Sequence, residues 1–228
     1  MAAGKLVWDA VGEKFWETGC DHGVLYPYDD GQKKYGDGVA WNGLTNVTES
    51  PSGAEATDLW ADNIKYGTIL SAESFGGTIE AYMSPPEFDA CDGAAELAPG
   101  VIIRQQTRKS FGFCWRTRIG NDVSEDVGYK LHIAYGCKAS PSEKSSSTVN
   151  DSPEASTLSW EFTSTPVNVT NMKPSAVLEI DSRTADPTKL KALEDILYGK
   201  DEVLEPSTPA VAARLPLPDE IKELMSEE

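Results

Sequence analysis

The strongest constraint on the fold is the stretch from Ser110 to Cys137, which has the pattern of a long β-hairpin. In its first part the alternating apolar set is Phe111, Phe113, Trp115, Thr117 and Ile119. In its second part the matching set is Tyr129, Leu131, Ile133, Tyr135 and Cys137. A period of two predicts two antiparallel strands with one buried face and one face in water, joined by an acidic loop. The predicted wet face carries Cys114, Arg116, Arg118, Lys130 and His132.

The rest of the chain predicts further strands that pair with this hairpin. Strand-like segments, bounded by Gly, Pro, Asn and Asp, cover residues 14–18, 22–28, 39–50, 64–84, 101–107, 156–165 and 176–181. Residues 5–8 read as a short strand or an N-terminal arm, and 85–93 as a single helical turn. The fold class that follows from these segments is mainly β.

One helix is predicted with clear ends. Asp186 is a capping residue, Pro187 suits a first turn, and Gly199 suits a helix end. Leu190, Leu193, Ile196 and Leu197 form the apolar stripe between them. We therefore expect a helix over 186–198 that flanks the sheet, and a short acidic helix after Pro218. The domain prediction is one β domain over residues 1–199, followed by a C-terminal extension over 200–228.

Residues 51–63 are predicted to be a long loop. They are polar and acidic, yet Leu59 and Trp60 lie in their middle. Because a plain linker needs no tryptophan, the pair predicts an apolar anchor for a neighbouring molecule, on a loop that is disordered in the free chain. The alternative is that Trp60 folds back onto its own chain. Trp8, Trp16 and Trp41 are also interface candidates, whereas Trp115 and Trp160 fall on the buried register.

The charge of the chain disfavours nonspecific nucleic-acid binding. Its formal net charge is −17, from 37 acidic and 20 basic residues, so the phosphate backbone would be repelled. The charge is also uneven: 17 acidic and 4 basic residues lie in 9–96, and 4 acidic and 8 basic residues lie in 97–150. This asymmetry indicates either a solvated acidic surface or complementary halves that meet between copies.

The four cysteines are predicted to be reduced thiols. Cys20, Cys91, Cys114 and Cys137 form no CxxC pair, and the last two fall on opposite registers of the hairpin. Reduced thiols fit folding in a cytoplasm. The N-terminal stretch lacks the apolar core of a signal peptide, and no segment reaches the length of a membrane span.

Catalysis has little support in the sequence. His22 and His132 are the only histidines, and we find no GxSxG, no phosphate-binding glycine loop and no set of residues at metal-ligand spacing. We therefore predict no catalytic, cofactor-binding or metal-binding residues, and no cofactor. The alternative class is a monomeric carbohydrate-binding or hydrolytic β-sandwich, which would use exposed tryptophans and a pair of carboxylates.

A resemblance to a known family rests on several strings together. They are VAWNGLTNVTESPSGAEATDLWADNIKY, SAESFGGTIEAYMSPPEFDACDG, PGVIIRQQTRKSFGFCWRTRIGND, GYKLHIAYG, SPSEKSSSTVNDSPEASTLSWEFTSTPV and KALEDILYG. In combination, from about residue 12 to 199, the chain resembles the major tail tube proteins of long, non-contractile-tailed bacteriophages. The stretch over 201–213 and the last helix fit less closely.

The resemblance implies a β-sandwich or barrel-like subunit with a flanking helix, and a structural virion protein. Its subunits would form hexameric rings that stack into a tube, with the inner sheets of a ring joined into one barrel around a channel. Genomic DNA would pass through that lumen without specific binding, on its way into the host. The implied partners are further copies of the chain and the tape-measure, tail tip and tail terminator proteins, with no membrane. The implied location is the virion tail, after assembly in the bacterial cytoplasm.

Overall fold

The computed structural model describes residues 5–146, 148–149, 151, 154–204, 207–208 and 210–226. In this part of the chain the fold is mainly β, with antiparallel strands and two α-helices. The main sheet has the strand order β2-β1-β10-β11-β12-β7-β4, while β3 pairs with β1 and β13 pairs with β11. Its strands are β1 (Phe15–Asp29), β2 (Lys34–Tyr35), β3 (Val39–Ala40), β4 (Leu44–Glu49), β7 (Gly76–Ala81), β10 (Phe111–Asn121), β11 (Gly128–Ala139), β12 (Leu158–Ser164) and β13 (Val177–Asp181).

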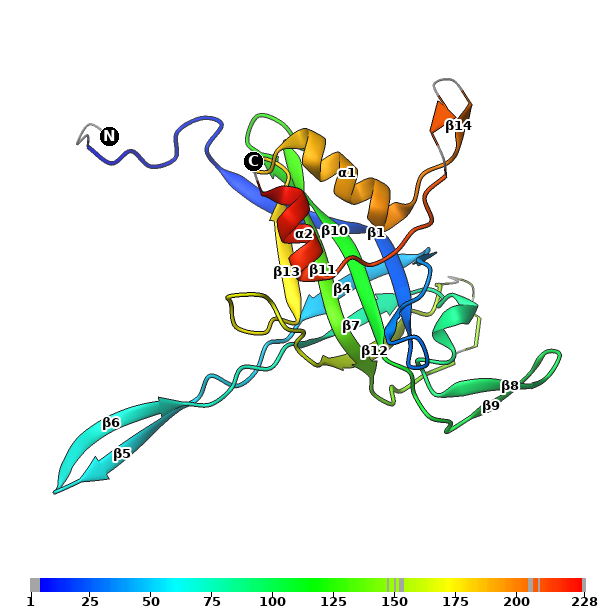
Figure 1. Ribbon diagram of the computed structural model, residues 1–228, viewed down its shortest axis with the longest axis horizontal. Coiled ribbons are helices and arrows are strands. Elements are labelled where there is room, and N and C mark those ends of the chain that lie inside the picture. Colours follow the sequence, from blue (N-terminus) through cyan, green and yellow to red (C-terminus); the bar gives the residue numbers. More distant parts are fainter. Residues whose placement is uncertain are drawn as a thin grey trace.

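The predicted hairpin is confirmed as β10 and β11 at the centre of this sheet (Figure 1). Its predicted faces are wrong. Cross-strand partners lie on the same side of a sheet, and the register pairs Phe113 with Ala134 and Trp115 with His132. The large apolar side chains of β10 therefore lie on one face and those of β11 on the other. Cys137 rejoins the β10 side, where it pairs with Phe111 across a bulge at Gly136.

The predicted wet face does not exist as one surface. Cys114 is fully buried and His132 is 5% exposed. Arg116 and Arg118 lie on the side of Cys114, whereas Lys130, which pairs with Thr117, lies on the side of Trp115. The prediction placed these three cations together, and the register separates them.

One face of the hairpin lies against a cluster of large aromatic side chains, here called the inner core. It contains Trp41, Phe88, Phe111, Phe113, Trp115, Trp160 and Phe162. The ring of Trp41 lies 4.7 Å from that of Phe88 and 5.4 Å from that of Trp160, and its Nε1 donates to the Met83 carbonyl at 2.9 Å. Trp115 and Trp160 are core residues as predicted. The prediction of Trp41 at an interface is wrong, because aromatic rings of the 3₁₀ turn η1 (Pro86–Phe88), of β10 and of β12 bury it.

The other face of the hairpin is covered by helices, and is here called the helix-side core. Helices α1 (Pro187–Tyr198) and α2 (Pro218–Met225) lie over β10, β11 and β13 (Figure 1). The buried members are Val24, Tyr26, Cys114, Leu131, Ile133, Tyr135, Leu193, Leu197, Leu215 and Ile221. Tyr26 donates to the Leu197 carbonyl at 2.7 Å, and Tyr135 donates to that of Pro216 at 2.9 Å. Both tyrosines thus tie the sheet to the helical layer.

The helix predicted over 186–198 is confirmed. The Asp186 carboxylate accepts from the amides of Thr188 and Lys189 at 2.8 and 3.0 Å, and Gly199 ends the helix at a φ of +79°. Three residues of the predicted stripe are buried and Ile196 is half-buried. The helix expected after Pro218 is α2, where Ile221 is buried and Leu217 is half exposed. Leu215 and Ile221 join the helix-side core, so this part of 200–228 shares a core with residues before 199.

Strand boundaries near the N-terminus differ from those predicted. The segments 14–18 and 22–28 form one long strand, β1, with register shifts between Thr18 and Cys20 and between Asp21 and Val24. Gly19 and His22 have φ of +65° and +54° there, as residues at bulges can. The segment 39–50 is two strands, because the turn at Asn42–Gly43 separates β3 from β4.

The prediction of four reduced cysteines is confirmed, since all four are free thiols. Cys91, Cys114 and Cys137 are fully buried. Burial raises the pKa of the Cys91 thiol to about 12, so it stays protonated at neutral pH.

Candidate assembly surface

A two-stranded hairpin stands away from the body at the end of the stretch predicted to be a loop. Strands β5 (Ala56–Ala61) and β6 (Ile64–Leu70) pair only with each other among the described residues (Figure 1). At its base, Ser52 and Ser74 exchange backbone hydrogen bonds of 2.8 and 2.7 Å. At its tip, Asp62 and Asn63 have φ of +50° and +65°, as the central residues of a two-residue type I′ turn do. We call residues 56–70 the projecting hairpin.

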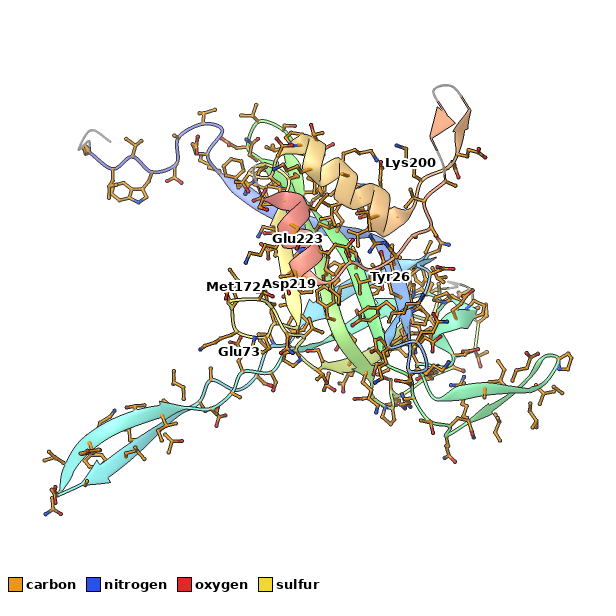
Figure 2. All side chains as sticks on the ribbon, viewed as in Figure 1. Tyr26, Glu73, Met172, Lys200, Asp219 and Glu223 are labelled. Atoms are coloured by element: carbon orange, nitrogen blue, oxygen red, sulfur yellow. The ribbon has the colours of Figure 1, made fainter. Side chains whose placement is uncertain are left out.

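The projecting hairpin has exposed apolar side chains on both faces. Pairing places Leu59, Ile64 and Ile69 on one face and Trp60 and Leu70 on the other. Trp60 is 69% exposed and Tyr66 is 75% exposed. Figure 2 shows the side chains of this hairpin standing clear of the body. An isolated two-stranded ribbon is only marginally stable in water, and exposed apolar side chains on both of its faces make it a candidate contact surface.

These findings revise the loop prediction for residues 51–63. The prediction that the stretch is a structureless loop is wrong, because it holds the first strand of the projecting hairpin. The signal that would have shown this is Asp62–Asn63, flanked by residues of high strand propensity. The exposure of Trp60 also contradicts the alternative in which it folds back onto its own chain.

A second apolar extension is the N-terminal arm, residues 5–13. Leu6, Val7, Trp8 and Val11 are each more than 70% exposed. The arm is fixed where it meets the sheet: the Gly12 amide donates to Asp122 at 2.9 Å, and Asn121 donates to the Gly12 carbonyl at 2.9 Å. Trp8, and Trp16 just beyond the arm, are exposed as an interface would require.

A third extension was not predicted. Strands β8 (Ala94–Ala98) and β9 (Val101–Arg104) form a hairpin that stands out near η1 (Figure 1). Its exposed apolar residues are Leu97, Val101, Ile102 and Ile103. The missed signal is Pro99–Gly100, a turn pair between two strand-like runs, with Gly100 at a φ of +77°.

Strands β4 and β13 are two of the edge strands of the sheet. In the described part of the chain, β4 pairs only with β7, and β13 pairs only with β11. Unpaired strand edges are templates for pairing with another chain. Beside β4, the face of β12 and β7 opposite the inner core is polar, and carries Glu80 and Glu161.

Most basic side chains of residues 97–150 find partners in the acidic part of their own chain. Arg116 and Arg118 contact Asp21 at 2.7 and 3.1 Å, and Lys130 contacts Glu17 at 2.5 Å and Glu179 at 2.8 Å. Partial burial alone would raise the pKa of Asp21, but hydrogen bonds from Arg116, His22 and Arg118 hold it well below its usual range. The positive charges of residues 97–150 are therefore largely compensated within the chain itself.

The two histidines lie in different surroundings. His132 stacks on Trp115 with ring centres 4.9 Å apart, and its Nε2 lies 3.0 Å from the Thr117 hydroxyl. Its Nδ1 lies 3.3 Å from Glu49 Oε1, close enough for an ion pair but without the geometry of a hydrogen bond. His22 contacts Asp21 at 2.8 Å. In the described residues, no three His, Cys, Asp or Glu side chains are grouped so that they could hold a metal ion.

Comparison with models of known protein families found no match to this chain, and a search of characterised proteins found no significantly similar sequence. Neither described helix is long and apolar enough to cross a membrane.

Proposed function

We propose that this protein is a structural subunit that assembles with copies of itself. The observation that carries the proposal is the projecting hairpin, whose exposed apolar side chains occupy both faces. The body needs no such extension, since its strands already enclose two cores. Apolar side chains repeated on three extensions suit contacts with several neighbours, because aromatic anchors dominate the energy of interfaces.

Together with the resemblance in the sequence, these surfaces favour a tail tube of a long-tailed, non-contractile bacteriophage. Copies would form rings of six that stack into the tube, within the virion tail. The open edges of β4 and β13 offer sites where neighbouring sheets join. The tape-measure, tip and terminator proteins would be further partners, and assembly would take place in the host cytoplasm.

The polar face of β12 and β7 is the surface we assign to the channel. The register splits the wet face predicted for β10 and β11 between the two sides of the hairpin, and α1 and α2 cover one of these sides. With about four strands from each of six subunits, ~24 strands at ~4.8 Å give a circumference of ~115 Å and a backbone diameter of ~37 Å. Such a channel admits duplex DNA, and Glu80 and Glu161 would keep its phosphates from binding.

The experiment that tests self-assembly is Trp60→Ala in the purified chain. We expect an unchanged melting temperature, because Trp60 contacts little of its own subunit, and at least a tenfold rise in the concentration needed for assembly, about the effect of losing one aromatic anchor. Sedimentation velocity and negative-stain microscopy measure the assembly. The matched control is Trp41→Ala, which should lower the melting temperature of the subunit itself.

A wild-type chain that stays a monodisperse monomer at high concentration would contradict the proposal. That outcome would return the protein to the alternative class, a monomeric carbohydrate-binding or hydrolytic β-sandwich. Normal assembly of Trp60→Ala would instead show that the hairpin is not the anchor.

A further inference from the structure

Three cationic side chains converge on one carboxylate at the base of the β8–β9 hairpin. Lys144 Nζ lies 3.0 Å from Asp92 Oδ2, Arg104 Nη1 lies 3.2 Å from the same oxygen, and Arg108 Nη1 lies 3.4 Å from Oδ1. These residues come from three different segments of the chain. Gly93 has a φ of +72°, and a side chain there would lie 3.1 Å from Cγ of Arg108, so glycine permits this approach.

The cluster lines a surface hollow of about 670 Å³. Its other lining residues are Gln105, Gln106, Pro141 and Ser142, three of which carry hydrogen-bond donors. Hollows of about 300–1,000 Å³ are typical of ligand sites. The size and the lining together fit a small polar group.

The charges in this hollow are not balanced. The Asp92 side chain is 8% exposed and supplies one negative charge against three positive ones. Arg108 also donates to the Ala139 carbonyl at 3.2 Å, so it is well satisfied. The Arg104 side chain is 57% exposed and that of Lys144 is 32% exposed, and the described contacts of each with a carboxylate use a single nitrogen. Arg104 and Lys144 therefore keep N–H donors that their described hydrogen bonds to Asp92 do not use.

We propose that this hollow is an oxyanion site, in which Arg104 and Lys144 bind a carboxylate or phosphate group. A second anion beside Asp92 would bring the local charge close to neutrality, and charge-assisted hydrogen bonds to such groups are among the strongest in proteins. The anion comes either from solution or from a carboxylate side chain of a second copy of the chain, which carries 37 acidic residues.

The test uses inorganic phosphate as the probe, with the full chain held as a monomer at low concentration. Melting temperatures are measured in phosphate and in chloride at equal ionic strength. We expect phosphate to raise the melting temperature in a saturable way, by about 3–6 °C at ten times its Kd. The double variant Arg104→Gln, Lys144→Gln should lose this difference. It keeps Arg108 beside Asp92, so no charge is left buried without a partner.

Two further variants are expected to change the phosphate-specific rise in melting temperature in different ways. Asp92→Asn removes the internal competitor, so the phosphate-specific rise should increase. The control is Lys189→Gln with Lys191→Gln on α1, which changes the net charge equally and should leave the rise intact. If phosphate and chloride act alike on the wild type, or if the Arg104/Lys144 variant keeps the full rise, the site does not exist and the cluster only cross-links the loops. ³¹P NMR tests the site without a melting curve. The wild type should broaden the phosphate line, and Lys144→Gln alone should broaden it less.

Measurements of assembly distinguish the two sources of the anion. Of the experiments on this site, only this one rests on the proposed function. If a second copy supplies a carboxylate, phosphate will suppress assembly relative to chloride at equal ionic strength, and the Arg104/Lys144 variant will assemble poorly in both. If the anion comes from solution, assembly will be the same in the two salts. A chain that does not assemble at all would contradict the proposed function and leave the melting test of the site valid.

Discussion

At the scale of single residues, the sequence predicted most of the tryptophan environments. It failed for the cations Arg116, Arg118 and Lys130, which do not share one face of the sheet. Trp60 lies in a polar and acidic stretch and Trp8 lies near the N-terminus, and both are exposed as an interface would require. Trp41 also follows a turn-rich segment, but its burial depends on η1 and β12, which are distant in the sequence. The sequence contains no local signal for such a contact.

Asp21 gives a prediction on pH. Its folded-state pKa is depressed, so it contributes stability above its unfolded pKa of about 3.9, and this contribution is lost as the pH falls below that value. Asp21→Asn should therefore cost about 1.5–3 kcal/mol at pH 7, because Arg116 loses a charged acceptor. The cost should shrink on acidification below pH 4.

Urea unfolding at pH 7 and at pH 3 measures this change. Asp62→Asn, the same substitution at the exposed tip of the projecting hairpin, is the control and should have little effect at either pH. A cost for Asp21→Asn that does not depend on pH would show that the arginines do not set the ionisation of this carboxyl.

At the scale of elements, local signals predicted α1 and the β10–β11 hairpin, whereas register decided which faces are buried. The cap at Asp186 and the stop at Gly199 are properties of the helix itself. The side to which Leu131 and Ile133 point depends on their pairing with β10, and that pairing also includes a bulge at Gly136. Alternation alone shows that a strand is amphipathic, but not which side of the sheet its apolar residues take.

The turn of the projecting hairpin gives a prediction for one element. Asn63 has a φ of +65°, a conformation that costs a β-branched residue about 1–2 kcal/mol. Asn63→Val should therefore weaken the hairpin and its assembly while the melting temperature of the body stays the same. Asn63→Gly, which suits the turn, is the matched control and should assemble normally.

Sedimentation velocity measures assembly for both variants, and a thermal melt measures the body. If Asn63→Val assembles at the same protein concentration as the wild type, the hairpin does not have to be folded before it binds a neighbour. A lower melting temperature would mean that the hairpin stabilises the body.

At the scale of the whole molecule, the structure changes what the uneven charge of the sequence means. Because basic residues of 97–150 pair largely with acidic residues of the same chain, the charge seen by a neighbour is the net −17. Mutual repulsion then opposes assembly, and apolar contacts drive it. We expect assembly to increase between about 0.05 and 0.5 M NaCl, as the Debye length shortens from ~14 to ~4 Å.

Light scattering at fixed protein concentration follows this response. Assembly that weakens steadily with NaCl would restore the other interpretation of the sequence, in which oppositely charged halves meet between copies. The expected increase of assembly with NaCl concentration does not conflict with suppression of assembly by phosphate. The first compares different ionic strengths, whereas the second compares two anions at the same ionic strength.

The cores on both sides of β10 and β11 have a consequence for amide hydrogen exchange. The ladder over residues 111–115 and 131–137 lies between the inner core and the helix-side core, so exposing those amides to deuterium requires the subunit to open. The ladder of β5 and β6 has no such cover in the free chain and should exchange in the earliest time points. In an assembled sample the protection gained on β5 and β6, with little change on β10 and β11, would trace the contact surface residue by residue.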